Sequence, residues 1–179
     1  MPGSRRLSQR ISEGDGIAII VLVRDADGAR TAEAQGAKAV AVDRAIDGIR
    51  GATTLPLLWI GTGVPADADA RTIRPEDELD GGDLECVVDV RDEEELELAL
   101  ERLDPEIFLL SARGADDEDD PLDTVLELLP DVPAGKLAIA EVDVGSRDEV
   151  LALERAGIDA VLVAGGHVDE LVGARPPEV

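Results

Sequence analysis

The sequence predicts a single α/β domain built on a parallel sheet, and a compact (β/α)₈ barrel is the favoured form of that sheet. Short aliphatic runs alternate with amphipathic helical stretches along almost the whole chain, as in repeated βα units. With 179 residues, of which 44% are hydrophobic, the chain can form one domain with a real core, whereas two domains would be cramped. The scarcity of aromatic residues leaves that core to Val, Ile, Leu and Ala, which suit strands covered on both faces.

Aliphatic runs predict seven strands, and an eighth is expected near Arg71–Arg74. The seven are Ile17–Val23, Ala39–Val42, Leu55–Ile60, Leu84–Val90, Ile107–Leu110, Leu137–Val142 and Ala160–Val163.

Helices fit between most of these strands. The stretch Asp92–Leu103 has the i, i+3, i+4, i+7 apolar spacing of a helix that lies on a sheet. Ser146–Glu149 forms the pattern of a capping box, which predicts a helix from there to about Ala156. Gly36 and Gly157 follow helical stretches and are expected in the left-handed conformation that ends a helix.

A weak internal repeat supports the parallel sheet, because Ala34–Val42 and Arg155–Val163 both read as helix end, glycine turn and buried strand. The pattern alone favours a closed barrel only slightly over a doubly wound open sheet. Gly61–Asp83 is polar and contains no full helix, so a barrel would have its third and fourth helices eroded. Such barrels commonly have about 250 residues, with roughly 200 as the lower end, so this one would be exceptionally small.

The chain ends suggest a simple domain organisation. Residues 1–16 contain arginines without a following apolar stretch, and we expect a flexible N-terminal arm rather than a secretion signal. Residues 17–175 are then the barrel domain. No apolar run reaches the roughly 18 residues of a membrane span, so we expect a cytoplasmic protein. Cys86 is the only cysteine, which excludes an intramolecular disulfide and a cysteine metal cluster.

The formal net charge of −24 is extreme for this length and argues against nucleic acid and anionic membranes as partners. A genome biased in its codon usage or a salty habitat accounts for this acidity. A surface that binds a cationic partner is the alternative explanation.

Several segments resemble the indole-3-glycerol phosphate synthase family. Ala32–Val42 is similar to its second βα unit, and Thr54–Leu58 is similar to its "LPVL" third strand. Val87–Leu96 follows the family's "LVEVHDEEEL" segment, and Ser146–Val163 resembles its "TPEDV…AGADAVLVG" ending. The resemblance covers Ile17 to Gly166, is strongest from Leu84 onward, and implies a (β/α)₈ barrel.

The resemblance also implies where the family's functional residues fall in the first three strands. The glutamate and lysine of its strand one match Val21 and Val23. The lysine that acts as general acid at the end of strand three matches Ile60, beside Trp59.

In the later strands, more of the family's polar residues are matched by polar residues of this chain. The strand-five glutamate matches Asp89, and the asparagine and arginine of strand six match Ser111 and Arg113. The strand-seven glutamate is retained as Glu141. The serine and glycine that follow it become Val142 and Asp143, and the glycine that ends strand eight becomes Ala164, followed by Gly165 and Gly166.

The family's chemistry needs lysines, and this chain has only Lys38 and Lys136. Each stands just before a predicted strand, whereas barrel active sites lie at the carboxyl ends of strands. Arginine does not replace a lysine as a general acid because it essentially never releases its proton. The acidic run Asp116–Asp120 would also repel an anionic substrate from the mouth. We therefore expect no synthase activity.

The remaining candidate residues each have two interpretations. Glu141 and Asp89 are either a carboxylate pair for acid–base catalysis or relics at strand ends. Gly165 and Gly166 form either a phosphate-binding turn or an ordinary tight turn. The single His167 has no evident metal partners, and Asp116–Asp120 lacks calcium-loop spacing, so we expect no metal ion or other cofactor.

The alternation of side chains along a strand predicts which way two further side chains point. Cys86 is expected to point outward and to be inert, and Trp59 to pack outside the barrel rather than stack on a ligand.

Two functional hypotheses follow. In the first, the barrel binds or converts a phosphorylated small molecule with Glu141, Asp89, Ser111, Arg113 and Gly165–Gly166. In the second, it is a non-catalytic scaffold or interaction barrel. The sequence does not predict an oligomeric state.

Overall fold

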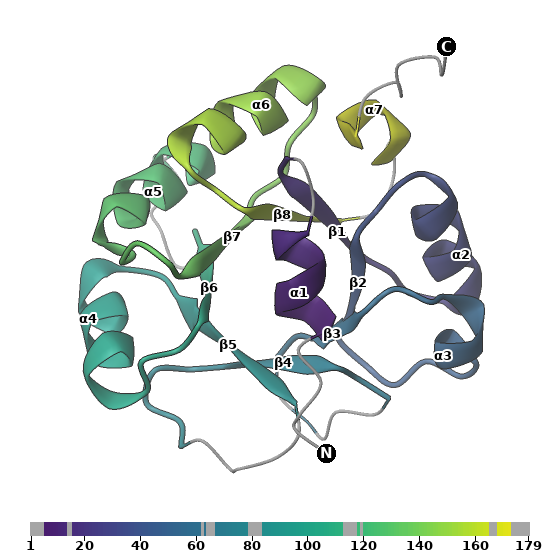
Figure 1. Cartoon of the computed structure of the whole chain (residues 1–179), viewed down its shortest axis with the longest axis horizontal. Coiled ribbons are helices and arrows are strands. Elements are labelled where there is room, and N and C mark those ends of the chain that lie inside the picture. The colour runs from purple at the N-terminus through teal and green to yellow at the C-terminus, as the bar shows by residue number, and fades with distance from the viewer. Residues whose placement is uncertain are drawn as a thin grey trace.

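Eight parallel strands close into a barrel in the order β1 to β8, with β8 paired to β1 (Figure 1). The computed structural model describes residues 6–13, 16–61, 63, 67–78, 84–112, 118, 120–164 and 168–172. The strands are β1 (Ala18–Leu22), β2 (Ala39–Val42), β3 (Leu57–Trp59), β4 (Ala70–Ile73), β5 (Glu85–Val90), β6 (Ile107–Ser111), β7 (Leu137–Glu141) and β8 (Ala160–Ala164). The predicted closed barrel is confirmed, including the eighth strand expected near Arg71–Arg74, which is β4.

Helices surround the barrel on all but one side. They are α2 (Ala26–Ala34), α3 (Ile49–Ala52), α4 (Glu93–Arg102), α5 (Pro121–Leu128) with the 3₁₀ turn η1 (Leu129–Asp131), α6 (Arg147–Ala156) and α7 (Val168–Val172). In the described parts of the connections from β3 to β4 and from β4 to β5 there is no helix, as predicted (Figure 1). No helix in the described ranges is long and apolar enough to cross a membrane.

Helix termini follow the predicted signals. The side chain of Asp92 accepts a hydrogen bond from the Glu95 backbone at the start of α4, and Ser146 accepts one from the Glu149 backbone at the start of α6. Gly157 ends α6 with φ of 110°, a conformation that a side chain would strain. These caps fix where α4 and α6 begin, just beyond the carboxyl ends of β5 and β7.

The N-terminal segment differs from the expected flexible arm. Arg6–Ser12 form the helix α1, which lies across the centre of the barrel in Figure 1. Leu7 and Ile11 of this helix are 0% and 4% exposed and join the hydrophobic cluster inside the barrel. The Glu85 carboxylate accepts hydrogen bonds from the backbone of Leu7 (2.7 Å) and Ser8 (3.3 Å) and thereby caps the helix. For residues 6–12 the expectation of an arm is therefore wrong, because α1 closes the amino-terminal end of the barrel.

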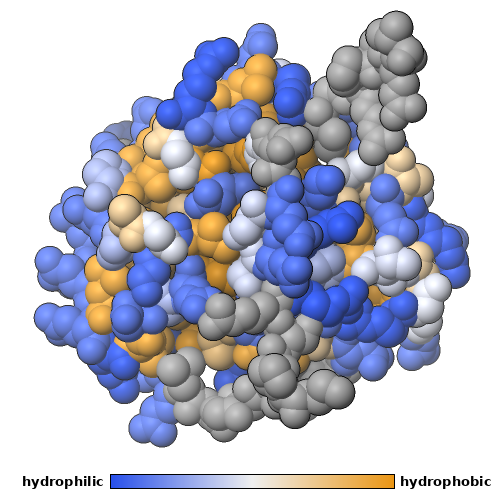
Figure 2. All heavy atoms as spheres, in the orientation of Figure 1, coloured by the Kyte–Doolittle hydropathy of each residue, from blue (hydrophilic) through white to orange (hydrophobic). Residues whose placement is uncertain are grey.

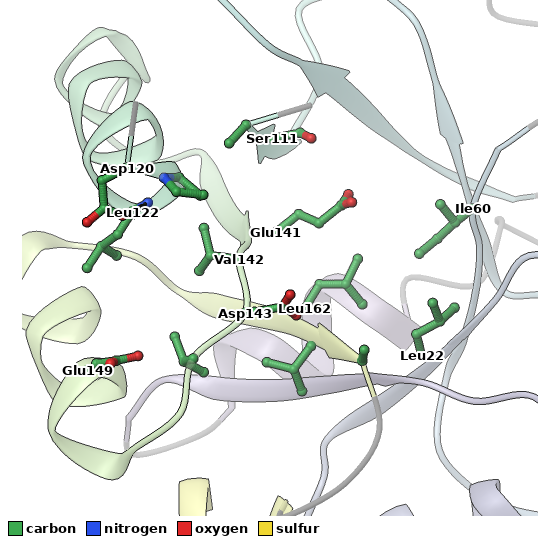
Figure 3. A pocket seen from close by; sticks show the side chains of 15 residues that line it. Leu22, Ile60, Ser111, Asp120, Leu122, Glu141, Val142, Asp143, Glu149 and Leu162 are labelled. Carbon is green, nitrogen blue, oxygen red and sulfur yellow. Dashed lines mark hydrogen bonds between the residues drawn. The ribbon is translucent and has the colours of Figure 1, made fainter. Parts of the chain in front are cut away.

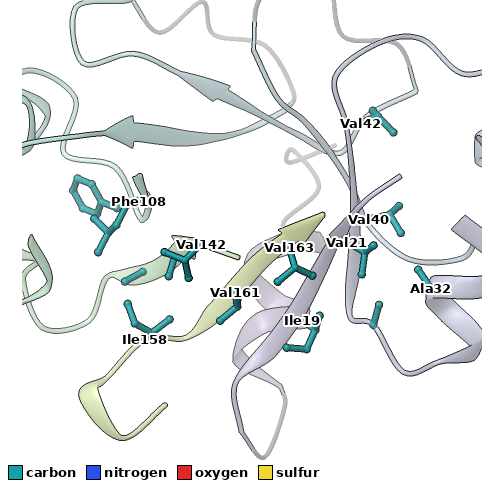
Figure 4. Close-up of a cluster of buried hydrophobic side chains, with 14 of the residues drawn as sticks. Ile19, Val21, Ala32, Val40, Val42, Phe108, Val142, Ile158, Val161 and Val163 are labelled. Carbon is teal, nitrogen blue, oxygen red and sulfur yellow. The ribbon is translucent and has the colours of Figure 1, made fainter. Parts of the chain in front are cut away.

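The core has two layers separated by the strands. An inner cluster fills the barrel with one set of alternate strand residues, such as Ile20, Leu58, Val87 and Ile139. An outer cluster lies between the strands and the helices and includes Ile19, Val21, Val40, Phe108 and Val161 (Figure 4). Hydrophilic side chains cover most of the face in Figure 2, and hydrophobic ones show between the helices. This division into two clusters is the packing expected of a small (β/α)₈ barrel.

The outer cluster also tests two predictions from strand parity. Cys86 is partly buried against it, and its thiol contacts the carbonyl of Leu84 at 3.9 Å. Trp59 is 5% exposed and belongs to the same cluster. Both side chains therefore point out of the barrel, as predicted.

Candidate functional site

A cavity of about 470 Å³ lies at the carboxyl ends of the strands. It is lined mainly by side chains from β1, β3, β6, β7 and β8 and by the starts of α5 and α6 (Figure 3). The lining residues that carry polar side chains are Ser111, Asp120, Glu141, Asp143 and Glu149. The apolar part includes Leu22, Ile60, Leu122, Val142 and Leu162. The cavity lining thus mixes aliphatic and acidic side chains.

The pairing registers explain which residues meet at this end. In a barrel of this kind, alternate strands contribute one inward residue each to a layer of four. Following the registers around the barrel, with the shift of two residues for every second strand that a shear of 8 implies, places Leu22 of β1, Ile60 just after β3, Asp89 of β5 and Glu141 of β7 in one layer at the mouth. We call these four residues the mouth layer.

The mouth layer corrects one part of the resemblance. Val21 and Val23, matched above to the family's strand-one glutamate and lysine, belong to the outer cluster and face the helices. The inward residue of β1 at the mouth is Leu22, which lines the cavity. The sequence match for β1 was therefore one residue out of register. Leu22, the residue that does face inward, is aliphatic, as are Val21 and Val23. Ile60, the match for the strand-three lysine, does face inward.

Glu141 is the polar residue best placed in the cavity. Its side chain extends from the end of β7 toward the middle of the cavity, on the side of Ser111 (Figure 3). Ser111 is its register partner on β6 and is fully buried. The structure therefore brings together two of the residues predicted from the sequence.

Asp89 lies on the neighbouring side of the mouth layer and is 7% exposed. Its Oδ2 atom is 3.5 Å from Arg74 Nη1 and 3.5 Å from Arg91 Nη2. Arg74 also donates to the Asp89 backbone carbonyl at 3.0 Å and pairs closely with Glu95 of α4. The second oxygen of Glu95 accepts the backbone N–H of Arg91 at 2.7 Å. A network of two arginines and two carboxylates thus surrounds the end of β5.

The charges of this network act on Arg74. Burial tends to lower the pKa of Arg74, but the negative charges of Glu95, Asp89 and Glu76 and the hydrogen bond to Glu95 outweigh it, so the pKa is raised above its ordinary value. Arg74 therefore provides a positive charge beside Asp89 at neutral pH.

Two of the carboxylates that line the cavity accept hydrogen bonds from backbone N–H groups at the starts of helices. Asp120 accepts the backbone N–H of Leu122 at 2.9 Å and caps α5, and Glu149 accepts the N–H of Gly145 at 2.9 Å beside the start of α6. Asp143 is exposed at the rim of the cavity. Among these groups, Glu141 and Asp89 remain the carboxylates of the mouth layer itself.

Several predicted site residues lie outside the described residues. They are Arg113, Gly165, Gly166 and His167, and with them most of the acidic run Asp116–Asp120. Within the described ranges, no group of three or more His, Cys, Asp or Glu side chains is arranged to hold a metal ion.

Both lysines of the chain lie at the end opposite the cavity. Lys38 directly precedes β2, and Lys136 directly precedes β7 and forms an ion pair with Asp104 at 2.9 Å. The mouth layer therefore contains no lysine.

Sequence reasoning missed Arg74, Arg91 and Glu95. A signal was present, since Arg74 and Arg91 directly follow strands four and five, where a barrel places its functional side chains. The tie of both arginines to Glu95 depends on the three-dimensional arrangement of α4.

Fold and cavity together define a TIM barrel whose candidate site occupies the face that barrel enzymes use. Comparison with solved structures supports this class. A thiamine phosphate pyrophosphorylase from Pyrococcus furiosus aligns with a TM-score of 0.66 at 17% identity, over 87% of this chain and 94% of that one. An N-acetylmannosamine-6-phosphate 2-epimerase from Clostridium perfringens aligns with a TM-score of 0.65 at 15% identity, over 83% and 86% of the two chains. These likenesses concern the fold alone.

Sequence comparison identifies the family. Residues 76–169 match the family model for indole-3-glycerol phosphate synthase, and the chain belongs to that family. The synthase from Campylobacter fetus subsp. fetus is 32% identical over 84 residues, which is 47% of this chain and 32% of the relative. The synthase from Chlorobium limicola is 36% identical over 86 residues, or 48% and 33% of the two chains. The part matched to these curated relatives thus spans about a third of their length. The family-model match contains β5–β8.

Proposed function

We propose that this barrel binds a phosphorylated small molecule at the mouth cavity and does not catalyse the indole-3-glycerol phosphate synthase reaction. The observation that carries the proposal is the composition of the mouth layer. The two positions on β5 and β7 are acidic, whereas Leu22 and Ile60 are aliphatic where the family places groups that transfer protons. A hydrocarbon side chain can neither donate a proton nor stabilise developing charge.

The ligand class follows from family membership and from the residues that come after two strands. Arg113 follows β6 and Gly165–Gly166 follow β8 in the sequence, the corner at which phosphosugar barrels hold phosphate. Backbone N–H groups of a glycine turn bind an anion without needing a lysine, and an arginine adds a bidentate contact. Any proton transfer that the site retains would involve Glu141 and Asp89.

The expected affinity is low. The described lining of the cavity includes the carboxylates of Glu141 and Asp143, and the whole chain has a formal net charge of −24. Both oppose an anion. We expect a dissociation constant on the order of 1 mM, about 4 kcal/mol, with binding favoured when salt screens the acidic groups.

The loss of synthase activity is tested by turnover of the carboxyphenylamino-deoxyribulose phosphate substrate. We expect no indole-3-glycerol phosphate above the uncatalysed rate, because the missing general acid alone is worth about 10² to 10⁴ in rate. The Glu141→Gln variant serves as the matched control. Measurable turnover that this variant abolishes would show that the site is an active synthase.

Binding is tested by titrating inorganic phosphate while backbone amide NMR shifts are followed. We expect saturable shifts at the amides of Gly165 and Gly166, weakened at least several-fold by Arg113→Ala. The control is Arg30→Ala, which removes the same charge from an exposed position on α2. Stationary glycine amides, or equal effects of the two variants, would refute the phosphate site.

A further inference from the structure

The described lining of the mouth cavity contains charges of one sign only. Four of its residues are carboxylates, namely Asp120, Glu141, Asp143 and Glu149, and none of the described lining residues is a lysine, an arginine or a histidine. Asp120 and Glu149 accept backbone N–H groups at the starts of helices. The carboxylates of Glu141 and Asp143 turn toward the middle of the cavity (Figure 3).

These two carboxylates belong to one strand end and lie at different depths. Asp143 follows Glu141 by two residues, so both side chains lie on the same face of the chain. Oε2 of Glu141 is buried, whereas Asp143 is exposed at the rim. In register, Glu141 is flanked by Ser111 of β6 and by Leu162 of β8. A cation that enters from solvent thus meets first one carboxylate and then the other.

The rest of the lining decides which kind of cation fits. It is mostly hydrocarbon and includes Leu22, Ile60 and Leu162. A hydrated metal ion gains nothing from such a surface, and within the described ranges no three or more His, Cys, Asp or Glu side chains are arranged to hold one. An alkylammonium group has three N–H donors for carboxylates, which only accept, and a hydrocarbon chain for the aliphatic lining.

We propose that the mouth cavity binds a primary amine with a short hydrocarbon chain. The ammonium group donates hydrogen bonds to Glu141 and Asp143, and the chain packs against Leu22, Ile60 and Leu162. A cavity of about 470 Å³ is of the size that encloses a small molecule. This inference goes beyond the proposed function, because it rests on the described lining alone and holds whether or not a phosphate binds at the glycine turn.

The arginines at the neighbouring end of β5 do not cancel the charge of the cavity. Arg74 and Arg91 are not among its lining residues, and their charges are matched by the carboxylates of Asp89 and Glu95. The formal net charge of −24 also attracts cations to the molecule as a whole.

The test compares three probes with similar chains and different charges: butylamine, butanol and butyrate. Methyl NMR spectra at pH 7 and low salt report binding at Leu22, Ile60 and Leu162. We expect butylamine to shift these methyl signals saturably and butanol to bind roughly tenfold or more weakly, as hydrogen bonds to charged groups imply. Butyrate should cause no saturable shift. If butanol or butyrate binds as tightly as butylamine, the cavity does not select a cation and the proposal is refuted.

Two variants test the carboxylates separately. Glu141→Gln and Asp143→Asn should each weaken butylamine binding at least several-fold and leave butanol binding unchanged, which a merely structural disturbance would not do. Asp143 is exposed, so its variant keeps the proposal testable if Glu141→Gln impairs folding. The matched control is Glu97→Gln, which removes the same charge from an exposed position on α4. Equal effects of the control and the two variants would refute the assigned contacts. Shifts by MgCl₂ as large as those by butylamine at equal ionic strength would refute the selection of an amine.

Salt separates this proposal from the phosphate site. Between about 0.01 M and 1 M NaCl the screening length falls from about 30 Å to about 3 Å, so butylamine binding should weaken several-fold, whereas phosphate binding should not weaken. If phosphate moves the glycine amides and butylamine moves no methyl signal, the amine site is refuted and the proposed function stands. If butylamine binds and phosphate moves no amide, the amine site stands and the phosphate site is refuted. If neither probe binds, both are refuted.

Discussion

Replacing Asp69 by alanine should be among the more damaging single changes at the amino-terminal end of the barrel. Asp69 directly precedes β4, and its side chain is 8% exposed. The carboxylate accepts hydrogen bonds from Arg50 Nη2 at 2.8 Å, from Arg6 Nη1 at 3.1 Å and from the buried Leu57 backbone N–H at 2.9 Å. It therefore ties α1, α3 and β3 to the start of β4.

The magnitude follows from what each partner loses. The Leu57 N–H is buried and would lose its acceptor, at a cost of about 1–3 kcal/mol. The arginine side chains are 43% and 37% exposed and would regain water, so each ion pair contributes only up to about 1 kcal/mol. We expect Asp69→Ala to lower the free energy of unfolding by about 3 kcal/mol, or the midpoint by roughly 6–12 °C.

The pH dependence provides a signature of this carboxylate. Burial raises the pKa of Asp69, but the hydrogen bonds from Arg50 and Leu57 and the charges of Arg50 and Arg6 outweigh it and hold the pKa below the ordinary 3.8. Its contribution is therefore fully present above 3.8 and is lost as the pH falls through the lowered pKa.

Urea unfolding followed by circular dichroism, at pH 7 and at about pH 2.5, measures both effects. The control is Asp47→Ala, which removes the same charge from an exposed loop position. A destabilisation by Asp69→Ala of less than about 1 kcal/mol at pH 7 would refute the reasoning from buried partners. A difference from the wild type that is equally large at low pH would refute the role of the ionised carboxylate.

Three further predictions concern the rest of the barrel. Leu7→Ala should lower the free energy of unfolding by about 2–5 kcal/mol, because Leu7 is 0% exposed. Urea titration measures this free energy, and an unchanged value would mean that α1 does not pack against the barrel in solution. Burial raises the pKa of Asp159 although the Ala138 N–H donates a hydrogen bond to its carboxylate, so ionisation of Asp159 opposes folding above pH 3.8. Asp159→Asn should therefore raise the melting temperature at pH 7 but not near pH 3. A lower melting temperature of this variant at pH 7 would contradict the reasoning. The chain has 41 acidic against 17 basic side chains, and 1 M NaCl shortens the screening length of their mutual repulsion to about 3 Å, so this salt should raise the melting temperature. A flat or falling midpoint would contradict the electrostatic account.

Much of the fold was predictable because each strand is a separate aliphatic run with a turn or helix signal beside it. Even β4 was placed from the space between two clear strands. The register within β1 was not predictable, because both faces of this strand are buried and Ile19 to Val23 show no polar alternation. For this reason the resemblance matched Val21 and Val23 to the family's functional residues, although Leu22 is the residue of β1 that faces inward at the mouth.

The helix α1 could not be predicted for a different reason. Seven residues are too few for a convincing helical period, and a helix this short is unstable by itself. It is held by Glu85, which lies 78 residues away from Leu7 in sequence. The same holds at the mouth, where the family resemblance identified Asp89, Ser111 and Glu141, but the ion pair between Arg74 and Glu95 depends on how α4 packs.

Fold and site are coupled on the side of the barrel that has lost its helices. Between β4 and β5 the described residues form no helix, and arginine side chains bridge this side instead: Arg74 reaches Glu95, and Arg102 donates to the Pro75 carbonyl at 3.3 Å. Arg74 therefore has two tasks, since it joins β4 to α4 and also fixes the carboxylate of Asp89. Arg91 lies 37% exposed at the same edge and makes a single ion pair among the described residues, with Asp89. A change at Arg74 should consequently lower stability and also displace the Asp89 carboxylate, because a shortened barrel has fewer elements with which to separate the support of its site from the support of its fold.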